Sequence, residues 1–440
     1  MISRWKWREH QSARPLSTRA IVLWAVFVLG VAVTSAAVLW WLYRGAEPRV
    51  QLDAIRTASA ITVAAGGAVA LLLAARRQRS TELTLEHQRE VAAAAERDAA
   101  EQRITELYTR AVDQLGDEKA PVRLGALHAL ERLAQNNPPQ RQTIVDVICA
   151  YLRMPYTPPD DQVPSEEAPE DAHSRYEQRR QELQVRLTAQ RILTAHLNPE
   201  AAASFWADID LNLTEAHLHQ LDLDACHIRR AQFDGATFAG WYARFRGATF
   251  AGDAGFGETE FAGTAEFQGA KFTGTAWFRD AKFAEYARFG EADFAGAAEF
   301  GRAEFARAAE FNRAEFARDA QFSGAMFAEI AWFDAATFAE TTWFQGAEFA
   351  GKTLFCHVKF TEYAQFGGAT FAGTMWFNGA EFIGNVNFGG GRVAPHARGF
   401  LPTGWIARPA VVGEEYGWLY MVRDEDSSEQ PAEAPGDGPA

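Results

Sequence analysis

Two cysteine-histidine pairs are the residues in this 440-residue chain that most suggest chemistry. Cys226-His227 and Cys356-His357 each join two side-chain types that bind zinc. A zinc site needs three or four such ligands converging on one point, and the two pairs hold different positions in the repeat described below. In that repeat, Cys226 takes an inward position and Cys356 an outward one. We therefore expect neither pair to bind a metal.

The other polar motifs are no more specific. Residues 401–404 read LPTG, which lacks the extra residue and hydrophobic tail of a sortase signal. The glycine run at residues 389–391 neither follows a buried strand pattern nor opens a helix, as a phosphate loop would. Four acids could supply oxygens to a hard cation, but a solvated edge explains them more simply: Asp208, Asp210, Asp222 and Asp224. We expect no catalytic, metal or cofactor site, because no nucleophile-base-acid set stands out.

Composition limits the functional classes. The formal net charge of -14 argues against nucleic-acid binding through a basic face. The three cysteines are too few, and odd in number, for a disulfide framework, so a reducing compartment fits best. Arginine far outnumbers lysine and alanine is abundant, a composition that suggests a bacterial source with a GC-rich genome.

Two uncharged segments near the N-terminus predict a membrane anchor within residues 1–79. Residues 20–43 form an uncharged run of 24 residues, and residues 57–75 form a second of 19, each long enough to span a bilayer as a helix. The first run could instead be a signal peptide, but it continues through Trp40 and Trp41 without a clear cleavage site. We read these aromatics as an interfacial belt, matched by Trp5 and Trp7 at the other surface.

The basic residues flanking the spans predict the orientation of the anchor. Five basic residues precede the first span: Arg4, Lys6, Arg8, Arg14 and Arg19. Three follow the second span: Arg76, Arg77 and Arg79. The loop between the spans also has three: Arg44, Arg49 and Arg56. By the positive-inside rule, both termini should be cytoplasmic and the protein should be integral to the inner (plasma) membrane. Small residues at Ala60, Ala64 and Ala68 favour close packing of a two-helix transmembrane hairpin. A pore is the alternative, although no ionisable residue interrupts either span.

Helical periodicity predicts a small cytoplasmic α-helical domain over residues 80–153. Residues 154–172 contain five prolines, beginning with Pro155, and many acidic residues, so we expect a disordered linker. A capping helix should follow within residues 173–210, with Phe205 and Trp206 against the next domain. Residues 389–422 are expected to form a C-terminal cap, and residues 423–440 a disordered tail.

Phenylalanine dominates residues 211–388, where 29 of the 32 phenylalanines lie. From Phe245 to Phe388 their spacing alternates between five and six residues, which makes an eleven-residue unit. Alanine stands two residues before the phenylalanine in 23 of the 29 cases, a recurrent A-x-F. Leu213, Leu218, Leu223 and Ile228 precede this run at a strict spacing of five.

An eleven-residue period also occurs in right-handed coiled coils. Here, steps of five and six would place successive phenylalanines roughly 140° apart on a helix, so no single apolar face results. In an extended chain, the alanine and phenylalanine of A-x-F point to the same side. The repeat therefore predicts short strands joined by corners.

Segments such as AEFQGAKF, ARFGEADF and AQFSGAMF resemble the pentapeptide-repeat proteins, whose unit carries a small residue two positions before a central Leu or Phe. The resemblance implies a right-handed quadrilateral β-helix, with four repeats per coil. The extra residue in alternate repeats departs from the family pattern and should enlarge two of the four corners, giving coils of 22 residues. Counting the central residues from Leu213 to Phe388 predicts about eight coils.

Two functions follow as hypotheses. The first is a membrane-tethered scaffold that presents a rigid solenoid to a cytoplasmic protein or to a second copy. The second draws on those members of the family that imitate DNA and inhibit topoisomerases. Residues 231–388 have a net charge of -8, but acids and bases are interleaved, which disfavours this alternative.

The residue between the alanine and phenylalanine of A-x-F should point outward, and it is usually polar. Trp332, Leu354 and Trp376 break this pattern at intervals of 22, so they should lie above one another as a candidate interaction stripe. Trp277 and Trp343 lie half a coil out of phase and form a weaker second face. The chain's own segment around residues 405–420 could cover the stripe, as could a partner.

Overall fold

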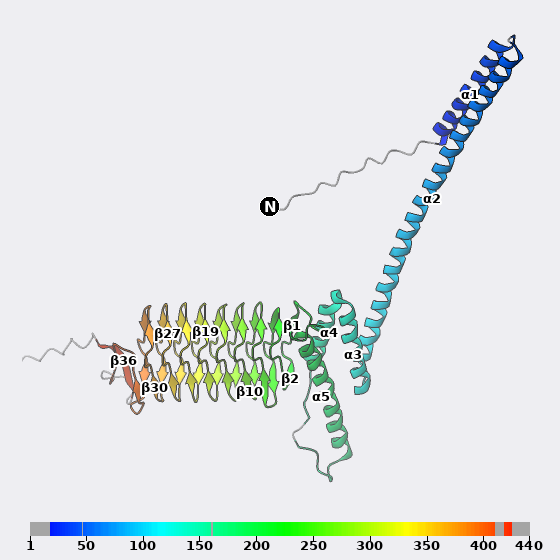
Figure 1. Ribbon diagram of the computed structural model, residues 1–440. Helices are drawn as coiled ribbons and strands as arrows, with labels where there is room; N and C mark the ends of the chain where they lie inside the picture. The colour runs from blue at the N-terminus through cyan, green and yellow to red at the C-terminus, as the bar shows by residue number, and fades with distance from the viewer. Residues whose placement is uncertain (1–17, 46, 160–161, 410–417, 425–440) are drawn as a thin grey trace, which may run out of the picture. The chain divides into compact units, whose positions relative to one another are not determined.

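The computed structural model describes residues 18–45, 47–159, 162–409 and 418–424 (Figure 1). The chain divides into two compact units, residues 1–103 and residues 104–440. Apart from Arg19, the basic and aromatic residues expected before the first span lie outside the described residues, and so does most of the expected tail. Each unit is described by itself.

The first unit contains two helices long and apolar enough to cross a membrane. Helix α1 spans Thr18–Tyr43 and helix α2 spans Pro48–Leu115. Their most apolar stretches have mean hydropathies of 2.4 and 2.0 and almost no buried side chains, a combination compatible with membrane insertion. Helix α2 runs on without a break through the segment where the sequence predicts the first helix of the helical domain.

The second unit begins with a helical bundle. After the end of α2 come α3 (Ala120–Asn136), the short 3₁₀ helix η1 (Pro138–Gln140), α4 (Arg141–Arg153) and α5 (Glu170–Leu197). A buried polar network joins three of them, because Glu182 on α5 accepts hydrogen bonds from Arg123 on α3 at 2.8 Å and Tyr151 on α4 at 2.9 Å. Arg186 also donates to Glu182, at 2.9 Å, so the buried guanidinium and the carboxylate are both partnered.

A parallel β-solenoid of about nine turns follows (Figure 1). The chain passes through four parallel sheets in turn, as the strands β12 (Ala276–Trp277), β13 (Lys282–Phe283), β14 (Ala287–Arg288) and β15 (Asp293–Phe294) show. Strand register confirms the 22-residue coil, since Ala276 pairs with Ala298 and Phe283 with Phe305. The right-handed sense and the square cross-section remain predictions.

The motif count predicts about eight coils, and the solenoid has about nine turns. The first sheet holds nine strands, from β1 (Asp210–Asn212) to β32 (Val386–Asn387). Beyond Phe388, the strands β33 (Arg392–Val393) and β34 (Gly399–Phe400) extend two other sheets. These two strands carry no A-x-F, so a count of that motif could not find them.

Two kinds of corner explain why the phenylalanine spacing alternates. In the five-residue steps, the second residue after phenylalanine has a left-handed backbone, as Gly346 (φ 63°) and Ala335 (φ 56°) show. This tight turn favours glycine, because a Cβ crowds the backbone in that conformation. The six-residue steps carry the extra residue and make the wider corner.

Stacked phenylalanine rings fill the interior. Phe278, Phe300 and Phe322 lie one above another with centroid separations of 4.8 and 4.9 Å and planes within 1° of parallel. Rings half a coil apart meet edge to face across the interior, as Phe289 and Phe300 do at 5.3 Å and 86°. Each buried ring contributes roughly 1.5–3 kcal/mol by leaving water, so the stacks dominate the stability of the solenoid.

Side chains of the helical bundle complete the N-terminal edges of three sheets. Gln142 on α4 exchanges two hydrogen bonds with the backbone of Asp210 in β1, at 2.9 and 3.0 Å. Gln190 on α5 does the same with His219 in β2 (His217–His219), at 3.1 and 2.9 Å. The Thr194 hydroxyl donates to the Asp222 carbonyl at 2.6 Å. These polar side chains satisfy strand edges that would otherwise accept another chain.

A hairpin lies at the opposite end of the solenoid. Strands β35 (Trp405–Pro409) and β36 (Leu419–Arg423) pair antiparallel, and β36 pairs with β33. Trp405 contacts the last stacked ring, Phe388, with centroids 5.1 Å apart, and Met421 is buried. Residues 410–417, which belong to the expected C-terminal cap, lie outside the described residues.

We expect a matched pair of substitutions at the tight corners to shift stability in opposite directions. Gly346→Ala should lower the free energy of unfolding by about 1–2 kcal/mol, although its Cβ would meet no atom within 4 Å. Ala335→Gly should raise it by less, because glycine also gains entropy in the unfolded chain. Hydrogen exchange of the solenoid amides measures both. A neutral Gly346→Ala would contradict the assigned backbone conformation.

Removal of residues 402–440 should expose Phe388 and the free edge of β33 to water. The shortened protein should aggregate at concentrations at which the full chain stays dispersed in detergent, because open strand edges template association. Size-exclusion chromatography with light scattering follows the outcome. A truncated protein that is equally dispersed and equally stable would show that the hairpin is dispensable as a cap.

Candidate interaction surface

The cysteine-histidine pairs do not converge on a common site. Cys226 is fully buried at the N-terminal end of the solenoid, and its thiol lies 3.8 Å from the Thr194 carbonyl oxygen. Cys356 is half-buried several turns away, and its sulfur lies 4.0 Å from the Trp376 carbonyl oxygen. Among the described residues, no group of three or more histidines, cysteines and acids is arranged to hold a metal ion.

The aspartates near the start of the solenoid form ion pairs. Asp210 binds both Nε and Nη2 of Arg229 at 2.7 Å. Asp224 pairs with Arg246, and Asp222 with Arg244 at 3.2 Å. Three of the four carboxylates considered as cation ligands are thus partnered by guanidinium groups, and the structure places Asp208 in a left-handed backbone position just before β1.

One sheet carries a continuous outward row of side chains whose chemistry changes halfway along. It runs from β6 (Tyr242–Arg244) through β10 (Thr264–Glu266), β14, β18 (Ala309–Glu310), β22 (Ala331–Trp332), β26 (Thr353–Leu354) and β30 (Met375–Trp376) to β34. The outward residues in register are Arg244, Glu266, Arg288, Glu310, Trp332, Leu354, Trp376 and Phe400. We call the last four the apolar stripe.

The charged half of this row is internally paired. Arg288 lies between Glu266 at 3.5 Å and Glu310 at 3.9 Å, and Arg244 reaches Glu266 at 3.6 Å. Such alternation satisfies each charge within the sheet itself, at roughly 0.2–1 kcal/mol per exposed pair. This row of paired charges ends at Glu310, and the next outward residue in register is Trp332.

The apolar stripe is the part of the row left facing water. Trp332 is 37% exposed and Phe400 is 55% exposed, while Leu354 and Trp376 are half-buried between them. Trp376 leans on Phe400 with ring centroids 5.4 Å apart. Ile330, two residues before Trp332, adds a further exposed apolar side chain beside the stripe. A row of this kind is typical of a contact surface.

The sheet bearing the weaker second face interrupts its tryptophans with polar residues. Trp277 and Trp343 are separated by Glu299 and Gln321 in register. Trp277 is 37% exposed, as Trp332 is, but its neighbours along the sheet are Gly255 and Glu299. Trp277 is therefore an isolated exposed tryptophan. Single exposed apolar residues are common on protein surfaces and do not by themselves indicate a contact.

The described part of the C-terminal segment does not cover the centre of the stripe. Strands β35 and β36 extend the sheet that ends in β33, a different sheet from the one that carries Trp332 and Leu354. Only β34 reaches the stripe, where Phe400 lengthens it by one residue. Residues 410–417 lie outside the described residues.

Three of the exposed apolar residues were not predicted from the sequence: Phe400, Ile330 and Trp241. Phe400 lacks the A-x-F context, and Ile330 lies outside that motif. Trp241, at 79% exposure, belongs to an insertion that lengthens one coil, because Ala231 pairs with Ala254, 23 residues later. The interval of seven between Phe238 and Phe245 was the available signal.

Comparisons with known proteins match the same region. Residues 213–260 and 256–304 match the family model described as pentapeptide repeats (9 copies). No curated protein and no solved structure matched the chain.

Burial raises the pKa of both Cys149 and Cys226 to about 12, and it also raises the pKa of Cys356. Since the thiolate is the reactive form, all three cysteines should react slowly with iodoacetamide at pH 8 in the native protein. Cys356, the least buried, should be labelled first. Peptide mapping measures the order, and rapid labelling of Cys226 would contradict its placement in the core.

Proposed function

We propose that this pentapeptide-repeat protein is a membrane-tethered, non-catalytic scaffold whose apolar stripe binds a partner protein in the cytoplasm. The observation that carries the proposal is the change from a paired charge ladder to four apolar residues along one sheet. The β-solenoid itself is scaffold-like, a repeating rod whose surface residues can vary without disturbing the core.

The stripe has the chemistry of a protein interface. Tryptophan is among the residues that contribute most to binding energy, particularly at the centre of an apolar patch with a polar rim. Here, the Arg288–Glu310 pair borders one end of the stripe. The partner should present a complementary apolar surface, and a second copy of the chain is the alternative occupant.

The proposed location of the protein follows from its two apolar helices, α1 and α2. The two apolar helices support integral membrane insertion, and the excess of basic residues outside the turn supports cytoplasmic termini at the inner (plasma) membrane. This orientation places the solenoid in the compartment where free cysteines stay reduced.

The DNA-mimic alternative gains less support. A DNA mimic needs a continuous anionic face. Along the sheet that bears the stripe, each acid pairs with an arginine, and elsewhere Arg307 lies between Glu285 at 3.9 Å and Glu329 at 3.0 Å. Mixed ladders of this kind lower the net field that a DNA-binding enzyme would recognise.

Trp332→Glu should abolish partner binding, whereas Trp277→Glu should preserve it. The two tryptophans are equally exposed, each is bordered by a glutamate in register, and both substitutions add the same charge. Crosslinking in intact membranes followed by purification should show a loss of about tenfold or more in captured partner for Trp332→Glu alone, as expected of a hot-spot residue.

Hydrogen exchange serves as the folding control for both variants. Equal loss of partner in the two variants would place binding elsewhere, and unchanged capture by both would refute the stripe as the docking surface. If the crosslinked species is a second copy of the chain, the stripe is a dimer interface and the partner assignment is wrong.

A further inference from the structure

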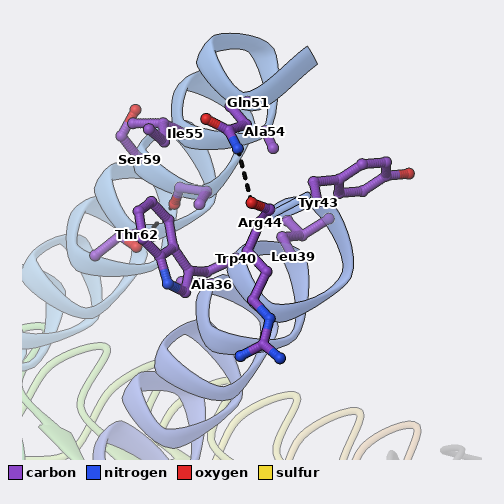
Figure 2. A pocket seen from close by; sticks show the side chains of 11 residues that line it. Ala36, Leu39, Trp40, Tyr43, Arg44, Gln51, Ala54, Ile55, Ser59 and Thr62 are labelled. Atoms are coloured by element: carbon purple, nitrogen blue, oxygen red, sulfur yellow. Dashed lines mark hydrogen bonds between the residues drawn. The ribbon is translucent and has the colours of Figure 1, made fainter. Parts of the chain in front are cut away.

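A cleft of about 310 Å³ lies between the two apolar helices near the turn that joins them. Its walls come from the last turns of α1 and the first turns of α2, and Figure 2 shows Trp40 on α1 and Arg44 just after it, with Gln51, Ser59 and Thr62 on α2. Small side chains make the space, because Ala36, Ala54, Ala58 and Ser59 all line it. This volume is at the lower end for small-molecule sites.

The cleft is apolar within. Leu39, Trp40 and Ile55 supply most of its larger side chains. The two hydroxyls in the cleft are satisfied within α2, since the Thr62 hydroxyl donates to the Ala58 carbonyl at 2.9 Å and the Ser59 hydroxyl to the Arg56 carbonyl at 2.8 Å. The Gln51 amide donates to the Arg44 carbonyl at 3.0 Å and ties the helices together at the turn (Figure 2). An alkyl chain therefore suits the interior.

Arg44 is the cationic group on the wall. Its guanidinium carbon lies 6.0 Å from the Trp41 ring centroid, and no carboxylate within 4.0 Å of it is seen among the described residues. Arg56, by contrast, has Asp53 at 3.8 Å. The tryptophans and Tyr43 mark this level as the membrane-water interface, where lipid phosphates lie.

We propose that the cleft binds one anionic phospholipid, with an acyl chain between α1 and α2 and the headgroup phosphate on Arg44. The apolar interior and the Arg44 guanidinium beside it match the two ends of such a molecule, and an arginine fork binds phosphate oxygens well. The site goes beyond the scaffold function but rests on insertion of the hairpin into a membrane.

Native mass spectrometry of the full-length protein, released from vesicles that contain equal phosphatidylglycerol and phosphatidylethanolamine, tests the site. Wild type should retain one phosphatidylglycerol in preference to phosphatidylethanolamine. Arg44→Gln should reduce this preference about fivefold, the equivalent of roughly 1 kcal/mol for one basic residue at an anionic surface. Ala58→Phe, which fills the cleft, should reduce retention of both lipids.

Arg49→Gln is the matched control, because Arg49 lies in the same turn region but does not line the cleft. It should leave the preference unchanged. An equal effect of Arg49→Gln would reduce the result to non-specific attraction and overturn the site, as would equal retention of the two lipids by wild type. Release of wild type from membranes by alkaline carbonate would overturn insertion as well as the site, which separates the two failures.

Discussion

Stacking of aromatic rings between successive coils is the interaction on which this solenoid depends. Strands in neighbouring coils are held at the spacing set by backbone hydrogen bonds, and flat rings stack at nearly the same distance, as Phe278, Phe300 and Phe322 show. Successive coils keep their rings in columns, and the 23-residue coil still stacks Phe238 on Phe261 with centroids 4.5 Å apart. The constraint therefore explains the 22-residue register from Phe245 to Phe388, the small residue two places before most rings, and the alternation of tight and wide corners.

The same constraint assigns function to the outside of the solenoid. Because alanine and phenylalanine occupy the inward positions, the outward residue between them is free to vary without a cost in core packing. One sheet uses this freedom in two ways, first as alternating Arg288 and Glu310 and then as Trp332, Leu354, Trp376 and Phe400. Charges that pair within the sheet need no partner, whereas exposed tryptophan gains free energy when another surface covers it. The proposed docking surface follows from that difference.

Much of this could be predicted from the sequence, for a physical reason. A-x-F predicts inward and outward positions strand by strand, so it predicts that Trp332, Leu354 and Trp376 stand in register, and the structure places them so. Features that depend on contacts between distant segments could not be found in this way. The bonds of Gln142 and Gln190 to the strand edges join residues far apart in sequence, and Phe400 joins the stripe only because β34 pairs with β30. The partner and the membrane orientation remain predictions.

A double-mutant cycle on the ring column tests the central claim most directly. In the full-length protein in detergent, Phe300→Leu and Phe322→Leu should couple by about 0.5–1.5 kcal/mol in the free energy of opening, measured by hydrogen exchange of the surrounding amides, because these rings stack at 4.9 Å. Phe300→Leu and Phe344→Leu, two coils apart in the same column, should be additive. Additivity in both cycles would contradict ring stacking as the interaction that holds the coils in register.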